Sequence, residues 1–301
     1  MKELGLMNVK VILNPYANRW KAQQRDTELK SALNAAGFAY DLVSTEAPKH
    51  AITLAETAVS QGYDAVIAAG GDGTISEVVN GLLRAAGEGD PLPLGILPMG
   101  SANDFSDLLG LPHDLTAAAR LIATGRTRKL DAGRVNNHFF INNSAIGMEP
   151  MVTIKSQKIK HLSGGTRYMA AMLRTLIQLR SWHMSIKWDN GSYTGNCILL
   201  SMCNGPRTGG FPMAPGAELD DGLLDFVFAP DMPKLMLVQV LVKLIKGTHI
   251  THPLVTFART TRLTVECEQG LPLHADGEIL GTAVRSITYQ VLPAKTLIFT
   301  P

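Results

Sequence analysis

A glycine-rich pentapeptide with an acidic residue at its centre lies in the first third of the chain. Gly70-Gly71-Asp72-Gly73-Thr74 follows a run of small and apolar residues, Ala65–Ala69, and precedes an amphipathic stretch that extends to Ala86. This order predicts a buried strand, a tight turn and the start of a helix. Glycines let backbone N–H groups approach an anion, and a helix N-terminus adds roughly half a positive charge. A phosphate-binding loop fits the pattern, and so does a plain turn with Asp72 or Thr74 as the helix N-cap.

Asp72 is an unusual residue for a phosphate-binding loop because its carboxylate repels phosphate. It fits such a loop if it acts through Mg²⁺, through a water molecule or on a hydroxyl group of the ligand. Two further polar loops favour the binding site over the plain turn. Gly100–Phe105 follows the predicted strand Leu94–Leu97, and Arg19 closes the loop after the predicted strand Val9–Leu13. Because parallel strands end at one edge of an open sheet, where ligands bind, these loops predict a nucleotide or phosphate site.

Two acidic segments in the second half of the chain also contain side chains that could act in catalysis or bind a cation. Asp276-Gly277-Glu278 lies between predicted strands, where Asp-Gly is a common hairpin turn and a carboxylate can also take a proton from a hydroxyl group. The segment from Glu218 to Leu223, Glu-Leu-Asp-Asp-Gly-Leu, offers oxygen ligands for a hard cation. A solvated acidic turn before a strand is the alternative for this segment.

The elements that must position the glycine loops alternate between strand and helix over the first 135 residues. The predicted strands are Val9–Leu13, Phe38–Ser44, Ala65–Ala69 and Leu94–Leu97, and the predicted helices are Arg25–Ala36, Pro48–Gln61, Thr74–Ala86 and Leu115–Ala123. Alternation at this spacing predicts a parallel sheet with helices on both faces.

Short β-rich stretches dominate the rest of the chain, interrupted by helical patterns near Arg167–Arg180 and Pro233–Lys246. This predicts a predominantly antiparallel β-sandwich, with the boundary between the two regions near residues 127–135. The apolar run Met169–Leu179 fits a core helix, or the lining of an acyl-chain cleft if the protein binds lipid. Lys155, Lys158 and Lys160 precede it and fit either a solvated face or contacts with phosphates or anionic headgroups.

Composition excludes several classes of protein. With 301 residues, 46% of them hydrophobic and 18% charged, the chain is neither disordered nor fibrous. A net charge of +2 without sustained Lys/Arg runs argues against nucleic acid as a partner. Its three cysteines, without CxxC spacing, are expected to be buried free thiols of a cytoplasmic protein. No apolar signal segment begins the chain, and lysines interrupt its longest apolar run, so we expect a soluble or peripheral protein.

Several of these motifs together resemble the diacylglycerol kinase catalytic domain, and most closely its bacterial soluble lipid kinase branch. They are Gly70–Thr74, Glu77-Val78-Val79-Asn80-Gly81, Leu97–Phe105, Lys129–Asp131, Phe140–Asn142, Asp220–Leu223, Thr248–Pro253 and Asp276–Glu278. The resemblance covers essentially the whole chain. The GGDGT element is shared with the related NAD kinases, and sphingosine kinases are also relatives. The PMGSANDF block is more specific, and the N-x-G-x-L-G-F-L segment expected of NAD kinases is absent.

The resemblance implies a fold of two domains. A Rossmann-like α/β domain at residues 1–130 would bind the nucleotide, with residues from about 290 to 301 returning to it. A β-sandwich at residues 131–289 would bind the lipid acceptor. The implied reaction is ATP- and Mg²⁺-dependent phosphorylation of a lipid hydroxyl group.

The resemblance also assigns site residues. The nucleotide contacts it implies are Asn14, Pro15, Tyr16, Ala17, Asn18, Thr45, Gly71, Asp72, Gly73, Thr74, Ile75, Ser76, Glu77 and Ser101. Asn18 departs from the family pattern, which has glycine there, but Asn tolerates left-handed backbone angles well. We therefore expect the turn to form.

Carboxylates carry the implied catalytic and metal roles. Glu278 would be the general base and Asp72 the residue that organises Mg²⁺-ATP, although a related branch assigns the base to the glycine-loop aspartate. A structural Mg²⁺ would be held by the Asp221 carboxylate and by backbone carbonyls near Glu218 and Leu223, with Asp131 and Asp225 in the same network.

The leading hypothesis is a cytoplasmic lipid kinase, peripheral to the inner face of the membrane, that acts on diacylglycerol or a similar lipid alcohol and makes transient contact with the membrane surface. A kinase for NAD or another small molecule is the first alternative, and a nucleotide-binding protein without turnover is the second. Edge strands and apolar helices would allow a homodimer.

Overall fold

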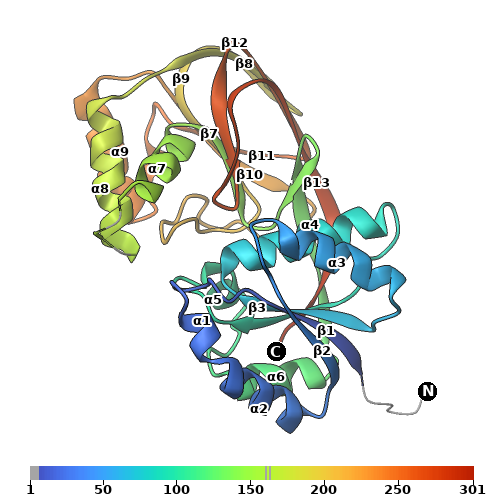
Figure 1. Ribbon diagram of the computed structural model, residues 1–301. Helices are drawn as coiled ribbons and strands as arrows, with labels where there is room; N and C mark the ends of the chain where they lie inside the picture. Colours follow the sequence, from blue (N-terminus) through green and yellow to red (C-terminus); the bar gives the residue numbers. More distant parts are fainter. Residues whose placement is uncertain (1–6, 160, 163) are drawn as a thin grey trace. The chain divides into compact units, whose positions relative to one another are not determined.

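The computed structural model describes residues 7–159, 161–162 and 164–301, and it divides the chain into two compact units (Figure 1). The first unit runs to Leu130 and takes up the chain again at Ala294–Pro301, and the second is Asp131–Pro293. Lys160 of the predicted basic stretch lies outside the described residues.

A parallel sheet forms the centre of the first unit. Its strands are β1 (Asn8–Leu13), β2 (Ala39–Ser44), β3 (Ala65–Gly70) and β4 (Leu94–Pro98), in the order β2-β1-β3-β4. The end of β13 (Glu278–Phe299) adds a parallel partner to β4, with Ile298 opposite Leu94. Strands buried on both faces need apolar residues throughout, and β3, with the sequence AVIAAG, is buried at every position.

Helices cover both faces of this sheet. They are α1 (Lys21–Gln24), α2 (Asp26–Ala36), α3 (His50–Ser60), α4 (Asp72–Ala86), α5 (Asp104–Leu108) and α6 (Leu115–Ala123). Within the unit, α3 and α4 lie together on one face, and α2 and α6 lie on the other (Figure 1). Alternate residues of each strand face opposite helical layers, so that Val9, Val11 and Leu13 join the core beneath α2 and α6.

The second unit is built from antiparallel pairs. Its strands are β5 (Thr127–Val135), β6 (His138–Phe140), β7 (Asn143–Gly147), β8 (Trp182–Trp188), β9 (Gly191–Cys203), β10 (Leu224–Pro230), β11 (Thr256–Thr260), β12 (Arg262–Ala275) and β13. The strand order is β11-β10-β9-β7-β12-β13, with β8 pairing β9 and β12, and β5 pairing β6 and β13. The predominantly antiparallel character predicted for this region is confirmed.

Two apolar cores lie on opposite faces of β7, β9 and β10. Ile146, Leu200 and Phe226 face an aromatic core that also holds Phe140 and Tyr289. Their neighbours in sequence point the other way, toward the helices α7 (Met148–Gln157), α8 (Gly164–Ile177) and α9 (Lys234–Ile245). A short 3₁₀ helix, η1 (His249–Thr251), follows α9. This helical side of the sheet holds the pocket described below.

Cys197, Cys203 and Cys267 are buried free thiols, as their spacing predicts. Among the described residues, none of the helices combines the length and the apolar character that a bilayer span requires.

Candidate functional site

The two glycine loops of the first unit pack directly against each other. A Cβ atom added to Gly100 would lie 2.4 Å from the Cα of Gly71, and one added to Gly71 would lie 2.9 Å from the Cα of Gly100. Neither position accepts a side chain without a backbone shift, because interiors are close-packed. The N–H of Met99 also donates to the carbonyl of Gly70 at 2.8 Å. The loops after β3 and β4 therefore meet at one edge of the sheet, as the sequence predicts.

Asp72 and Thr74 tie the start of α4 to neighbouring loops. Oδ1 of Asp72 accepts the backbone N–H of Phe105 at 3.0 Å, and Oγ1 of Thr74 accepts Nδ2 of Asn14 at 2.9 Å. The N-cap of α4 is Gly71, in an extended conformation and without a side-chain hydrogen bond. The alternative in which Asp72 or Thr74 is the N-cap is wrong, because both side chains bond to other loops instead.

The loop after β1 forms a left-handed turn. Asn18, Arg19 and Trp20 have φ angles of 51°, 57° and 71°. The turn expected at Asn18 is therefore formed without glycine, because asparagine enters this region at low cost. The rings of Tyr16 and Trp20 stack edge to face with centroids 4.2 Å apart, and both side chains are exposed.

The remaining predicted nucleotide contacts differ in exposure. Gly73 and Ser101 are exposed, whereas Thr45, Thr74, Ile75 and Ser76 are buried. The carboxylate of Glu77 accepts the backbone N–H groups of Lys49 at 3.0 Å and Ala51 at 3.2 Å, at the N-terminus of α3. A carboxylate is favoured there by the helix dipole, so Glu77 fixes α3 against α4.

An acidic network surrounds the turn before β10 in the second unit. Oδ1 of Asp221 accepts the N–H of Leu223 at 3.0 Å, while Oδ2 is buried without a hydrogen bond and lies 3.5 Å from Nη1 of Arg259. Asp131 accepts the N–H of Gly222 at 2.7 Å. Burial raises the pKa of Asp225, and the charge of Arg259, whose Nε lies 3.2 Å from it, only partly offsets this.

This network places Asp131, Asp221 and Asp225 together, as expected. Over the part of the chain that the structure describes, no three His, Cys, Asp or Glu side chains gather to hold a metal ion. A cation at Asp221 would therefore need backbone carbonyls as its other ligands. The buried Oδ2 of Asp221, which makes no hydrogen bond, fits such a role.

Asp276 and Gly277 form the hairpin turn between β12 and β13, with φ angles of 44° and 81°. The Asp276 carboxylate accepts three backbone N–H groups, from Ile141 at 2.9 Å and from Asn142 and Asn143 at 3.0 Å each. Asp276 therefore holds the hairpin against the β6–β7 connection. Glu278 begins β13 opposite Ala275 and is partly exposed.

A buried acid–histidine pair lies near this hairpin. Oε1 of Glu149, in the first turn of α7, lies 3.3 Å from Nε2 of His274 and accepts Nδ2 of Asn143 at 2.8 Å. Burial alone would raise the pKa of Glu149, but His274 and Asn143 bring it below its ordinary value. This pair was not predicted from the sequence. An acid flanked by Met148 and Pro150-Met151-Val152 was the available signal of a buried carboxylate.

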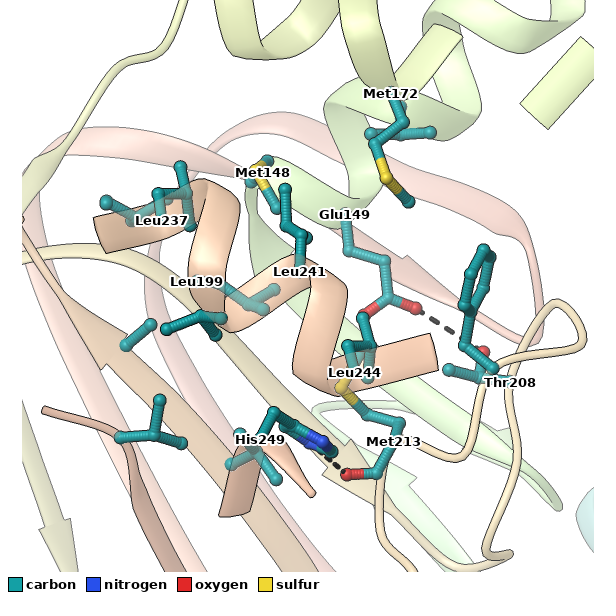
Figure 2. A pocket seen from close by; sticks show the side chains of 17 residues that line it. Met148, Glu149, Met172, Leu199, Thr208, Met213, Leu237, Leu241, Leu244 and His249 are labelled. Atoms are coloured by element: carbon teal, nitrogen blue, oxygen red, sulfur yellow. Dashed lines mark hydrogen bonds between the residues drawn. The ribbon is translucent and has the colours of Figure 1, made fainter. Parts of the chain in front are cut away.

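Glu149 lines an apolar pocket in the second unit, between the sheet and the helices α7, α8 and α9 (Figure 2). Met148, Met172, Leu199, Leu237, Leu241 and Leu244 line it together with Glu149, Thr208 and His249. Thr208 donates to Oε1 of Glu149 at 3.4 Å, and Nε2 of His249 donates to the Met213 carbonyl at 2.9 Å (Figure 2). The cavity volume is about 40 Å³. A few polar groups in an apolar lining are typical of sites that bind apolar ligands.

Comparison with known proteins identifies the family. The diacylglycerol kinase catalytic domain matches residues 8–135, and the YegS C-terminal NAD kinase beta sandwich-like domain matches residues 143–300. A diacylglycerol kinase of Staphylococcus haemolyticus is 31% identical over 274 residues, which is 90% of this chain and 82% of that protein. The chain belongs to the diacylglycerol kinase family. Another diacylglycerol kinase, from Staphylococcus aureus strain bovine RF122 / ET3-1, is 30% identical over 90% of this chain and 86% of its own length.

The solved structure of a diacylglycerol kinase from Bacillus anthracis str. Sterne has the same two-domain fold. It superposes on this family member with a TM-score of 0.79 over 99% of both chains, at 24% sequence identity. The resemblance to the diacylglycerol kinase catalytic domain, drawn from motifs along the whole chain, is thus confirmed, and the matched β-sandwich-like domain spans most of the second unit.

Proposed function

We propose that this diacylglycerol kinase family member transfers the γ-phosphate of ATP to the hydroxyl group of diacylglycerol or a similar lipid alcohol, with Mg²⁺ as cofactor. The observation that carries the kinase assignment is the backbone contact between Gly71 and Gly100 at the N-terminus of α4. Glycines let these two loops pack closely, and loops at the ends of parallel strands beside a helix N-terminus are where phosphate groups meet backbone N–H groups.

The first unit is the proposed nucleotide domain, of Rossmann-like type. Gly73, exposed in the first turn of α4, would offer its N–H to a phosphate oxygen, and Ser101 would offer its hydroxyl group. Asn14 and Thr45, at the ends of β1 and β2, border the same edge of the sheet. The other contacts proposed are Pro15–Asn18, Gly71, Asp72 and Thr74–Glu77. Buried members of this set would act through their backbone or by shaping the loop.

Two cation sites are proposed. Asp72 would orient the cation that accompanies ATP, which neutralises the charge that develops on the phosphates during transfer. The structural cation would be held by Asp221 and by carbonyls near Glu218 and Leu223; this is supported by the buried Oδ2 of Asp221, which makes no hydrogen bond. Glu278 is the proposed general base for the acceptor hydroxyl group. In the alternative, Asp72 is the general base and Glu278 organises Mg²⁺-ATP.

The second unit is the proposed acceptor domain. The apolar pocket supports a lipid acceptor because its lining suits an acyl chain and Glu149 supplies a buried hydrogen-bond acceptor. Its volume of about 40 Å³ is below the roughly 300 Å³ typical of ligand pockets, so acyl-chain entry would require α8 and α9 to move apart. An enzyme that takes such a substrate would work at the membrane, and we propose a cytoplasmic protein peripheral to the inner face.

The test is a transfer experiment with γ-labelled ATP and Mg²⁺ in mixed micelles. The acceptors are diacylglycerol, phosphatidylglycerol, sphingoid bases and NAD, each offered separately. Label in diacylglycerol or another lipid supports the proposal. Label only in NADP would make the chain a small-molecule kinase, and nucleotide binding without any labelled product would make it a binding protein.

A further inference from the structure

Exposed apolar side chains concentrate on two helices of the second unit. Ten of the thirteen large hydrophobic side chains exposed in the described residues lie between Leu162 and Leu254. The most exposed are Ile177 on α8, at 74%, and Leu235 on α9, at 73%. Such a concentration marks an interaction surface rather than scattered surface residues.

These side chains form ordered rows. On α8, Met169, Leu173 and Ile177 follow at intervals of four residues, which places them on one face of the helix. On α9, exposed Leu235, Val238, Val242 and Ile245 alternate with the buried row Leu237, Val240 and Leu244. A surface helix of a globular protein has a polar outer face, whereas α9 is apolar on both faces.

The rows on α8 and α9 belong to one surface. Nζ of Lys234, at the start of α9, donates to the carbonyl of Ile177, at the end of α8, at 3.4 Å. Met172 of α8 and Leu237 of α9 line the same pocket, and the two helices lie next to each other (Figure 1). The inner faces of both helices therefore line the pocket, while their outer faces form an exposed patch.

The helices α8 and α9 contain no acidic residue, and the exposed Asp231 lies just before α9, where its Oδ2 accepts the Ser181 hydroxyl group at 3.3 Å. Residues 150–188 and 232–265, which include α8 and α9, contain twelve of the 28 Lys and Arg residues and none of the 26 acidic residues. The rest of the chain therefore has a net charge of −10, against +2 for the whole chain. Lys234, Lys243 and Lys246 belong to α9 or directly follow it.

We propose that the outer face of α8 and α9, formed by Met169, Leu173, Ile177, Leu235, Val238, Val242 and Ile245, is the surface by which the enzyme inserts into an anionic lipid bilayer. The inference rests on the proposed lipid kinase function, and it names the partner of that function. Apolar side chains enter the acyl boundary while flanking lysines meet anionic headgroups. Docking in this way would present the pocket-lining helices to the membrane that holds the substrate.

A second copy of the chain fits this surface less well. A twofold dimer through α8 and α9 would bring the lysines that flank this apolar face in two copies close together. Like charges across an interface oppose association, and α8 and α9 themselves contain no acidic residue to compensate them.

The test is sedimentation with phosphatidylcholine vesicles, with and without phosphatidylglycerol. The wild-type chain should bind only the anionic vesicles, with an affinity that falls as salt rises. Variant L235Q/V242Q/I245Q should bind about tenfold more weakly or worse, and K243Q/K246Q should lose about fivefold per lysine. The matched control is V59Q on α3, an exposed valine of the first unit, which should bind as the wild type does.

Two further measurements separate the outcomes. Circular dichroism checks that each variant is folded, and transfer to a dispersed short-chain diacylglycerol should be unchanged, because none of the substituted residues lines the pocket. Vesicle binding is measured without turnover, so it can succeed even if the kinase proposal fails. Equal vesicle binding by L235Q/V242Q/I245Q and the wild type would overturn the inference. The inference would also be overturned if light scattering showed that the wild type is a dimer and that L235Q/V242Q/I245Q is a monomer.

Discussion

The glycines of the two apposed loops should respond differently to alanine. In Gly100→Ala the new Cβ would lie 2.4 Å from the Cα of Gly71, a backbone atom that cannot rotate away. In Gly73→Ala the new Cβ would meet nothing within 4 Å, and Gly73 has no left-handed φ angle. Gly100→Ala therefore tests the packing of the loops, and Gly73→Ala tests their proposed contact with phosphate.

The expected magnitudes follow from this geometry. Overpacking costs about 1–3 kcal/mol, and each kcal/mol lowers the melting temperature by about 2–4 °C in a domain of this size. Gly100→Ala should therefore melt several degrees below the wild type. Gly73→Ala should match the wild type or exceed it, because alanine stabilises a helix by up to about 1 kcal/mol relative to glycine.

The affinity for ATP should fall in Gly73→Ala, although this variant should be as stable as the wild type. If its N–H meets a phosphate oxygen, a Cβ beside it weakens a charge-assisted hydrogen bond worth about 1.5–3 kcal/mol, which is about a 10–100-fold loss of affinity. Thermal unfolding and calorimetric titration with ATP provide the two readouts. Wild-type stability of Gly100→Ala would refute the packing argument, and wild-type ATP affinity of Gly73→Ala would refute the phosphate contact.

Three predictions concern the second unit. Asp276→Asn should lower the free energy of unfolding, measured by urea titration, by about 1–3 kcal/mol, because the carboxylate accepts three backbone N–H groups. The control Glu268→Gln, on the exposed side of β12, should leave the free energy of unfolding unchanged. Burial lowers the pKa of His249, so the native state favours neutral imidazole; stability should fall as pH drops below about 6.5, and less steeply in His249→Asn. An unchanged pH slope in that variant would contradict this assignment. Mg²⁺ should raise the melting temperature of the wild type over EDTA, and Asp221→Asn should lose that increment; an equal increment in both would place the cation elsewhere.

The strands and helices of the first unit could be predicted from the sequence because residues close together in the chain determine where each of them begins and ends. Buried parallel strands such as β3 appear as short apolar runs, and glycine at position 37 adopts φ 78° where α2 ends. The contact of the two glycine loops was also predictable, because parallel strands end at one edge of the sheet.

Long-range contacts account for what the sequence did not reveal. Glu149 and His274 are 125 residues apart, and only the pairing of β12 with β7 brings their side chains together. The predicted strands Ser286–Leu292 and Thr296–Phe299 form one strand, β13, which pairs with β12 before Pro293 and with β4 after it. The capping of α3 by Glu77 and of α5 by Asp72 likewise depends on tertiary packing.

The most direct test of the central claim is phosphate transfer by the wild type and Glu278→Gln, measured side by side with γ-labelled ATP, Mg²⁺ and diacylglycerol in mixed micelles. We predict labelled lipid from the wild type, and a rate lower by about 100-fold or more in Glu278→Gln with ATP affinity retained, because a general base contributes about 10²–10⁴-fold. A wild-type enzyme that labels no lipid, or a Glu278→Gln variant with full activity, would contradict the account.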